Sequence, residues 1–363
     1  MKILFYRNKL NRGGMGRVMT NLANMFACSH ESIFVTLRKH PDEYSLNKNV
    51  KRYNMTTREK ASRMIADIYL FFQMAGKLRK ILKQEKPDVI ITFYQLDSLF
   101  VFLSKIFLRF PQIVSVRNDP YIELRKKHKR ILYKLLYSLT DGCVFQTEHA
   151  KAFFSQKIQR KSAVIHNLIE KRLFDIIMDE RKDIIGIGRL DSGKSWHVAI
   201  KAFSLIADQV IAKLFIYGGG EKHDYLSDYI EKLNLSDRVI LAGYTTKVEE
   251  IVANAKLFVF ASEHEGMPNA IIEALILGTP CISTRFSGGS ADMLIESGIN
   301  GVLVPVGDYE AMATAMLKIL TDFDYAKQLG QNAKERARTE FDPEKVFGQW
   351  ENFIISIIGK RKK

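Results

Sequence analysis

The sequence predicts an α/β protein built from two doubly wound domains that face a central cleft. Short apolar runs alternate with longer helical patterns in both halves of the chain. Because these runs are apolar throughout, they are typical of parallel strands that helices cover on both faces. Glycine-rich turns follow several of the runs, at the sheet edge where such folds bind ligands.

Two series of strands are expected. In the first half the apolar runs are 2–7, 32–37, 88–93, 112–116 and 142–147. In the second half they are 183–190, 213–220, 238–244, 257–262, 280–284 and 301–308. The first series ends near 164–175, which predicts domains over 1–168 and 169–342. A final amphipathic helix is expected over 343–363, after Asp342-Pro343.

Composition indicates a cytoplasmic globular protein. The chain has 363 residues, 47% of them hydrophobic and 26% charged, which is enough for a core in each of two domains. No apolar run approaches the ~18–20 residues of a membrane span, and the apolar start before Arg7 is too short for a signal peptide. Three cysteines in apolar contexts predict reduced core residues and not a disulfide framework.

The net charge of +15 lies entirely in the first half of the chain. Residues 1–180 carry 33 Lys and Arg against 16 Asp and Glu, a net of +17, and residues 181–363 carry 22 against 24, a net of −2. Such a basic half favours an anionic partner, namely nucleic acid, a phosphorylated ligand or a membrane surface. A solvated basic face is the alternative.

Several turns at strand ends contain groups that suit an anion. Gly13, Gly14 and Gly16 lie between the first strand and the first helix, where backbone N–H groups can approach a phosphate. The spacing is not that of a dinucleotide fingerprint. Arg189 directly follows a strand and Lys194 precedes a helix, and two such cations suit a diphosphate. Exposed turn charges would explain the pair equally well.

Two further turns and one helix start complete the expected site. Gly218 and Tyr244 follow the next two strands, where a flat base could lie, although plain strand-to-helix turns are the commoner explanation. The stretch 262–283, SEHEGMPNAIIEALILGTPCIS, places Glu265 before a Gly-x-Pro turn and Glu273 one turn into the following helix. The first amides of that helix, 267–270, are available for phosphate or sugar hydroxyls. Two surface carboxylates near a helix start are the alternative explanation.

These motifs resemble the nucleotide-sugar half of the GT-B glycosyltransferases of family GT4, which have two Rossmann-like domains. The stretches GRLDSGKS, LAGY, EHEGMPNAIIEALILGTPCIS and GGSADMLIESGINGVLVPVGD carry the resemblance. The family signature E-x7-E is matched by Glu265 and Glu273. The stretch GGMGRVMTNLANMF is similar to the family's N-terminal glycine loop, and VIHNLI, with Asn167, to its domain junction.

The resemblance implies a role for each matching position. Arg189, Lys194 and Glu265 would be catalytic, the two cations stabilising the departing diphosphate in place of a metal ion. Glu273 would bind the ribose, and the final helix with Trp350 would return to the first domain. The full set of implied donor-binding residues is Gly14, Gly16, Gly188, Arg189, Lys194, Gly218, Tyr244, Glu265, Gly266, Met267, Asn269 and Glu273.

One region departs from the family pattern. Where many members carry a histidine near the reacting sugar, this chain reads IVSVRNDPYIE. Asn118 or Asp119 could face the sugar or the acceptor there, beside Arg117. No catalytic base is assigned, since the departing phosphate can take the acceptor proton. His128 and His149 match no family position.

The expected activity is that of a retaining hexosyltransferase. A hexose or N-acetylhexosamine would pass from a UDP-sugar, acting as co-substrate without metal or other cofactor, to a lipid-linked saccharide in capsule, O-antigen or similar envelope polysaccharide synthesis. A sugar-nucleotide epimerase of related fold is the alternative within enzymes. A basic nucleic-acid-binding protein is the alternative of another class, but no nucleic-acid motif is present.

A basic, amphipathic segment predicts where the protein works. Residues 123–139, ELRKKHKRILYKLLYSL, combine six cations with apolar side chains at helical spacing. Such a helix suits an anionic membrane surface, which favours a peripheral location on the inner face of the plasma membrane. The alternative is that 131–139 packs on the sheet with its lysines in solvent.

Overall fold

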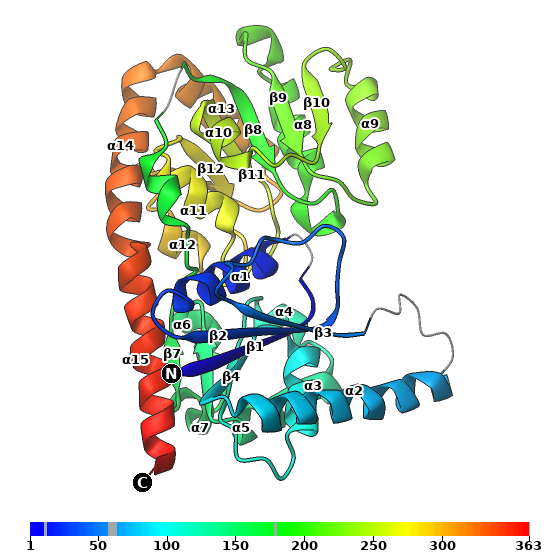
Figure 1. Cartoon of the computed structure of the whole chain (residues 1–363). Coiled ribbons are helices and arrows are strands. Elements are labelled where there is room, and N and C mark those ends of the chain that lie inside the picture. Colours follow the sequence, from blue (N-terminus) through cyan, green and yellow to red (C-terminus); the bar gives the residue numbers. More distant parts are fainter. Residues whose placement is uncertain (11–12, 57–63, 178–179, 363) are drawn as a thin grey trace. The chain divides into compact units, whose positions relative to one another are not determined.

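The structure is a computed structural model, which describes residues 1–10, 13–56, 64–177 and 180–362. The chain forms two compact units (Figure 1). Unit 1 comprises Met1–Leu168 together with Pro343–Lys363, and unit 2 comprises Ile169–Asp342. The final helix therefore belongs to the same unit as the first strand.

Unit 1 contains a parallel sheet of seven strands in the order β3-β2-β1-β4-β5-β6-β7. The strands are β1 (Lys2–Lys9), β2 (Glu31–Arg38), β3 (Lys51–Thr56), β4 (Val89–Thr92), β5 (Gln112–Ser115), β6 (Gly142–Phe145) and β7 (Ser162–Val164). The helices are α1 (Gly14–Phe26), α2 (Met64–Glu85), α3 (Gln95–Ser104), α4 (Pro120–Glu123), α5 (Lys127–Leu139), α6 (Glu148–Ala152), α7 (Gln156–Gln159) and α15 (Pro343–Lys362).

Alternate residues of the central strands enter different cores. Ile3 and Phe5 of β1 pack with α1 and α15, whereas Leu4 and Tyr6 pack with α2. This alternation follows from the two-residue period of a strand, which sends successive side chains to opposite faces. From α15 the side chains that enter the core are Val346, Trp350, Ile354 and Ile357, at helical spacing.

Unit 2 contains a parallel sheet of six strands in the order β10-β9-β8-β11-β12-β13. The strands are β8 (Lys182–Ile187), β9 (Leu214–Tyr217), β10 (Val239–Gly243), β11 (Ala255–Phe260), β12 (Cys281–Thr284) and β13 (Val302–Val304). The helices are η1 (Lys171–Asp175), η2 (Ser192–Lys194), α8 (Trp196–Ser204), η3 (Ala207–Gln209), α9 (His223–Lys232), α10 (Val248–Ala253), α11 (Asn269–Ile276), α12 (Ala291–Leu294), α13 (Tyr309–Thr321) and α14 (Phe323–Glu340).

The prediction of two doubly wound parallel sheets is confirmed, and each sheet reverses its winding direction once. In unit 1 the chain winds outward from β1 to β3 and returns to add β4 on the other side of β1. In unit 2 the same reversal places β11 beside β8. At such a switch point the two loops that leave the carboxyl ends diverge, and ligands bind in the space between them.

Two strands of the unit 1 sheet were not predicted, and one helix begins later than expected. β3 forms one edge, pairs only with β2 and reads KRYNMT, so it lacks the apolar run of a buried strand. β7 forms the other edge with three half-buried residues. The segment 123–139 is not one helix, because α4 ends at Glu123 and α5 begins at Lys127.

Candidate functional site

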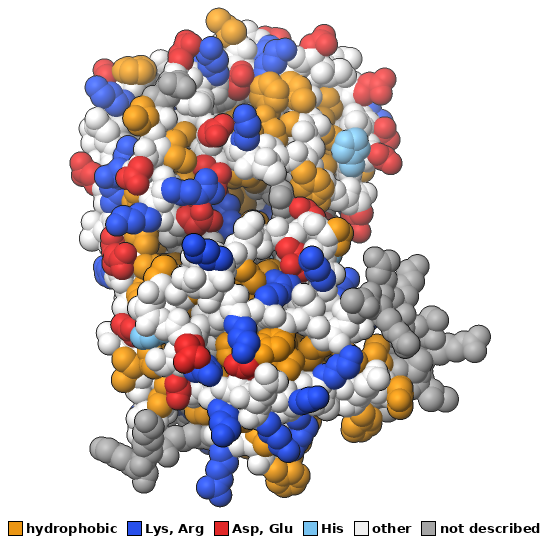
Figure 2. Space-filling view, viewed as in Figure 1, with side chains coloured by type: hydrophobic (Ala, Val, Ile, Leu, Met, Phe, Trp, Pro, Cys, Tyr) orange, Lys and Arg blue, Asp and Glu red, His pale blue; other side chains and the backbone are white. Residues whose placement is uncertain are grey.

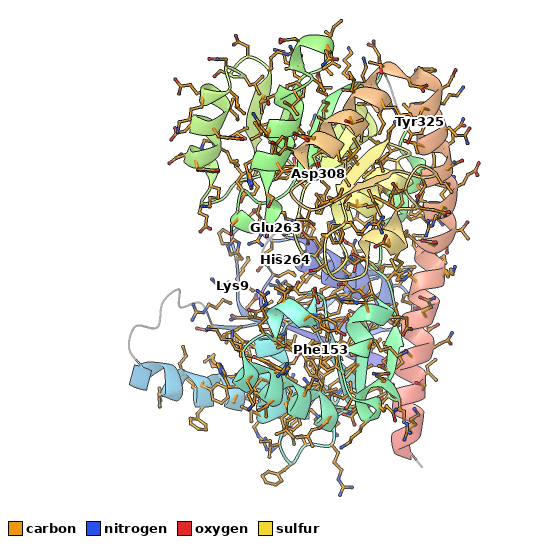
Figure 3. All side chains as sticks on the ribbon, turned by 180° about the vertical axis from the view of Figure 1, so that it is seen from behind. Lys9, Phe153, Glu263, His264, Asp308 and Tyr325 are labelled. Atoms are coloured by element: carbon orange, nitrogen blue, oxygen red, sulfur yellow. The ribbon has the colours of Figure 1, made fainter. Side chains whose placement is uncertain are left out.

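At the switch point of unit 2, the turn after β8 contacts the turn after β11. The N–H of Glu263 donates a hydrogen bond to the carbonyl oxygen of Gly193 at 3.0 Å. The hydroxyl of Ser195 donates to a carboxylate oxygen of Glu263 at 2.7 Å. The ammonium group of Lys194 forms an ion pair with the carboxylate of Glu265. Figure 3 shows Glu263 and His264 together in the turn after β11.

The ion pair between Lys194 and Glu265 is largely shielded from solvent. Their side chains are 16% and 19% exposed, and the Lys194 ammonium lies 4.7 Å from the centre of the Phe260 ring. Since an ammonium group has three donors, Lys194 can bind a second oxygen while it remains near Glu265. The pair therefore places one cation and one acceptor side by side at the carboxyl edge of the sheet.

Arg189 lies at the same edge but extends into solvent. Its side chain is 77% exposed, and its guanidinium donates to Asp191 at 3.0 Å. Asp191 also accepts a hydrogen bond from the N–H of Gly193 at 3.1 Å, which shapes the turn before Lys194. Because a guanidinium has five donors, Arg189 can bind an oxyanion while Asp191 keeps its orientation.

The glycines after β8 and β9 permit a close approach of the two turns. Gly218 has φ +146°, and a β-carbon there would overlap the carbonyl oxygen of Gly188. Any other residue at Gly218 would therefore push the two turns apart. A β-carbon on Gly219 would lie 2.5 Å from the Tyr244 ring, so that ring lies directly on the glycine turn. With 83% of its surface exposed, Tyr244 offers a flat aromatic face.

The turn into α11 places a buried carboxylate within the helix. Gly266 precedes the turn, Met267 is buried in the core, and Pro268 precedes Asn269, the first residue of α11. Because the Met267 side chain is directed into the core, only its backbone can serve a ligand. Glu273 is the fifth residue of α11 and is 2% exposed, which is rare for a carboxylate and favours a specific role.

Sequence reasoning missed three residues of this site. Ser195 adopts the left-handed conformation with φ +44°, which is unusual for serine and orients the start of α8. Glu263 binds that serine, and the ring of His264 lies 3.6 Å from the position of a β-carbon on Gly193. Glu263 and His264 stand in the same EHEG stretch as Glu265, so their place before the turn was the available signal.

In unit 1 the predicted residues lie at the ends of β1 and β5. Gly14 is exposed at the first position of α1, and Gly16 is buried two residues later. Asn118 is exposed after β5, whereas Asp119 is buried and accepts a hydrogen bond from the N–H of Tyr121 at 2.9 Å. Asp119 therefore caps α4. Arg117, between β5 and Asn118, is buried.

Neither a metal-binding cluster nor a membrane-spanning helix occurs in the part of the chain that the structure describes. Within it, no group of three or more His, Cys, Asp or Glu side chains is arranged to hold a metal ion. None of its helices is both long enough and apolar enough to cross a bilayer.

Both halves of the chain match models of known families. Residues 12–172 match the model described as Glycosyltransferase Family 4, and residues 170–336 match that of the Glycosyl transferases group 1. An uncharacterized glycosyltransferase of Methanocaldococcus jannaschii is 30% identical over 78% of this chain and 82% of its own length.

A second relative has a named activity. The GalNAc-alpha-(1->4)-GalNAc-alpha-(1->3)-diNAcBac-PP-undecaprenol alpha-1,4-N-acetyl-D-galactosaminyltransferase of Campylobacter jejuni is 27% identical over 98% of this chain and 99% of its own length. Among solved structures, Anabaena HepE in complex with UDP and glucose has a TM-score of 0.83 and 18% identity, covering 98% of this chain and all of its own. The fold of this chain is that of the GT-B proteins.

Proposed function

This chain belongs to the group 1 glycosyltransferases of family 4, and we propose that it transfers a hexose or N-acetylhexosamine from a UDP-sugar to a lipid-linked saccharide with retention of anomeric configuration. The observation that carries this proposal is the pairing of Lys194 with Glu265 at the switch point of unit 2. A cation for the departing diphosphate and an acceptor for sugar hydroxyls are thereby adjacent.

The two cations at this edge have separate tasks. As the bond between the anomeric carbon and the diphosphate oxygen breaks, negative charge develops on that oxygen. The Lys194 ammonium, held by Glu265 and Phe260, stabilises this charge with little reorganisation. Arg189 binds the same diphosphate from its exposed position. The acceptor hydroxyl forms the new bond to the anomeric carbon and gives its proton to the departing phosphate oxygen.

The nucleoside occupies the neighbouring strand ends in this proposal. Tyr244 supplies a face for the uracil ring, and Glu273 in α11 binds the ribose hydroxyls. Gly266, Met267 and Asn269 offer backbone groups to the donor sugar. In unit 1, Gly14 and Gly16 offer backbone N–H groups to a phosphate in this proposal, and Asn118 contacts the acceptor or the sugar.

A lipid-linked acceptor is proposed from two relatives and one surface. Two Campylobacter jejuni relatives are named for acceptors linked to undecaprenol diphosphate, and both match this chain over 95% or more of its length. The chain would then serve the assembly of an envelope polysaccharide, on the cytoplasmic face of the membrane.

The surface in question is one side of α5. Tyr133, Leu136 and Tyr137 pack into unit 1, whereas other apolar side chains of the helix face solvent: Ile131, Leu132, Leu135 and Leu139. In the turn after α3, Phe107 is 95% exposed. Figure 2 shows hydrophobic side chains and Lys or Arg side chains intermixed on unit 1. Apolar side chains flanked by cations favour an anionic bilayer over neutral lipid.

One experiment tests the proposal directly. The purified protein is incubated with each of a panel of UDP- and GDP-sugars and a diphosphate-linked saccharide acceptor, and the product is analysed by NMR. An α-linked product from an α-linked donor supports the proposal. Conversion of the nucleotide sugar alone into its epimer would instead support the epimerase alternative, and an inverted product would contradict the mechanism.

A further inference from the structure

A pocket in unit 1 lies at the switch point of its sheet. It is bounded by the ends of β4 and β5 and by the starts of α1 and α3. Its lining residues are Met15, Phe93, Tyr94, Gln95, Ser115, Val116, Arg117, Asn118, Glu123 and Tyr137. The position corresponds to that of the Lys194 site in unit 2, where the winding of the sheet also reverses.

Arg117 brings a buried positive charge to this pocket. Burial lowers the pKa of its guanidinium to about 9, and no charged neighbour offsets that effect. Its contacts with the rings of Phe93 and Trp350, 4.1 and 5.7 Å from the guanidinium carbon, are weaker than contact with a carboxylate. A buried cation without an anionic neighbour is costly, so its retention calls for a reason beyond packing.

The hydrogen bonds of Arg117 leave one edge of the guanidinium open. Its Nη1 donates to Oδ1 of Asn167 at 2.8 Å. Among the described residues, no acceptor lies within hydrogen-bonding distance of its Nε or Nη2. These two N–H groups lie on the same edge of the planar group and form the fork that binds two oxygens of a carboxylate or phosphate.

A second side chain that lines this pocket also has an unsatisfied donor. In the described structure the amide Nε2 of Gln95 is buried without an acceptor. Gln95 is the first residue of α3, a ten-residue helix that begins without a side-chain cap. The positive end of the helix dipole therefore points toward the same space. The two residues that carry these three buried donors both line the pocket, one of them at the start of α3, and each feature favours an oxyanion.

We propose that this pocket binds an oxyanion carried by the acceptor, held by the Nε and Nη2 edge of Arg117 and by the amide of Gln95. The oxyanion is either a phosphate of the lipid diphosphate or the carboxylate of a sugar acid. The assignment to the acceptor rests on the proposed function, whereas the binding of an oxyanion does not. Arg117 would then determine which acceptors are accepted.

Glu123 contributes a carboxyl group to the same lining and has its own partner. The side chain of Asn118 hydrogen-bonds to it, and burial raises its pKa. A carboxylate has about four acceptor sites, so the hydrogen bond with Asn118 leaves others unused. Glu123 is therefore available to accept hydrogen bonds from the hydroxyls of the sugar that carries the oxyanion.

Side-chain NMR of the whole protein with labelled arginine tests the binding site. The Nε–H signal of Arg117 is assigned by its loss in Arg117→Lys, and it is followed during titration with inorganic phosphate, methyl β-D-glucuronide and the neutral methyl β-D-glucoside. We expect a saturable shift of this signal with phosphate or with the glucuronide, and no shift with the glucoside. The anion that causes the shift shows whether the pocket takes a phosphate or a carboxylate. Gln95→Leu should weaken that binding by about three- to tenfold. The matched change Gln156→Leu, at the exposed first residue of α7, should not alter it.

Three results would overturn the proposal. The first is no shift with either anion, and the second is an equal shift with the glucoside. The third is displacement of the anion by saturating UDP, which would assign Arg117 to the donor phosphates. Melting temperatures of both variants show whether they fold. UDP binding to the wild type is measured separately. If the protein does not bind UDP, the proposed function fails, whereas the anion titration still shows whether the pocket binds an oxyanion.

Discussion

Lys194 and Glu265 form an ion pair that bridges the turn after β8 and the turn after β11. These residues are 71 positions apart in sequence, and they meet because β8 and β11 are neighbours across the switch point of the sheet. In the proposed reaction each partner must also contact the donor. Removal of either one therefore removes a proposed substrate contact and leaves the other without its ion-pair partner.

Replacement of Lys194 by alanine should lower turnover more than donor affinity. The ammonium stabilises charge that develops only as the sugar departs, so kcat is expected to fall by about 10²–10³ while the KM for donor changes little. Steady-state kinetics with the preferred UDP-sugar measure both. Lys256→Ala removes an exposed lysine of β11 and serves as the control. Wild-type turnover in Lys194→Ala would exclude the role in diphosphate stabilisation.

The two glutamates of the E-x7-E pattern should fail in different ways. Glu265→Gln is expected to abolish transfer nearly completely, because it removes the negative charge that pairs with Lys194 and replaces one of the two acceptor oxygens with a donor. Glu273→Gln keeps the volume of a buried side chain and should mainly weaken UDP binding. Isothermal titration with UDP separates the effects. Equal loss of UDP affinity in both variants would contradict the division of roles.

The sequence predicted the unit 2 sheet more completely than the unit 1 sheet, for a physical reason. All six strands of unit 2 contain apolar runs, and the turns after them contain the recognisable motifs. In unit 1 the edge strand β3 is polar and half-exposed, so no buried-strand pattern marks it. The pairing of strands that are distant in sequence could not be predicted, because the sequence does not show that β8 lies beside β11.

Side-chain contacts within the candidate sites could not be predicted from the sequence either, because they join segments that are distant in the chain. Arg117 was seen only as a neighbour of Asn118, since its burial depends on Phe93, Asn167 and Trp350 from distant segments. Likewise, the pairing of Ser195 with Glu263 depends on a left-handed backbone that serine seldom adopts. Residue type and spacing thus identified the turns, and tertiary contacts determined which side chains within them act together.

Gly218→Ala should destabilise unit 2 much more than a comparable change elsewhere. Its β-carbon would overlap the carbonyl oxygen of Gly188, in addition to the strain of its positive φ. We expect a loss of at least about 3 kcal/mol in the free energy of unfolding. Gly307→Ala has positive φ but open space, and should cost about 1 kcal/mol. Urea denaturation compares them, and equal losses would refute the close approach of the two turns.

Chelation of divalent metals should leave transfer intact. In the proposed mechanism Lys194 and Arg189 supply the positive charge that Mg²⁺ or Mn²⁺ supplies in other transferases. Initial rates in excess EDTA are therefore expected to match those without it. Restoration of activity only by added Mn²⁺ or Mg²⁺ would contradict the assignment of these cations.

The basic side of α5 should determine binding to anionic membranes. Lys126, Lys127, Lys129 and Arg130 are all exposed next to the apolar residues Ile131 and Leu135. Each cation near an anionic surface contributes about 1 kcal/mol, so their combined change to Gln should weaken binding by more than tenfold. Sedimentation with phosphatidylglycerol vesicles measures this, while phosphatidylcholine vesicles and high salt should leave the wild type free.

Matched variants separate the contribution of this helix from that of net charge alone. Changing four exposed lysines of unit 2 to Gln, namely Lys213, Lys232, Lys256 and Lys327, removes the same charge elsewhere. That variant should bind the vesicles as the wild type does, because its charges lie outside α5. A third variant, Ile131→Ser with Leu135→Ser, keeps the cations and should reduce binding to phosphatidylglycerol vesicles at low salt, because less apolar surface enters the bilayer interface. UDP affinity should be unchanged in all three variants. If the α5 charge variant sediments as well as the unit 2 variant, then α5 is not the docking surface and the membrane contact lies on another part of the protein.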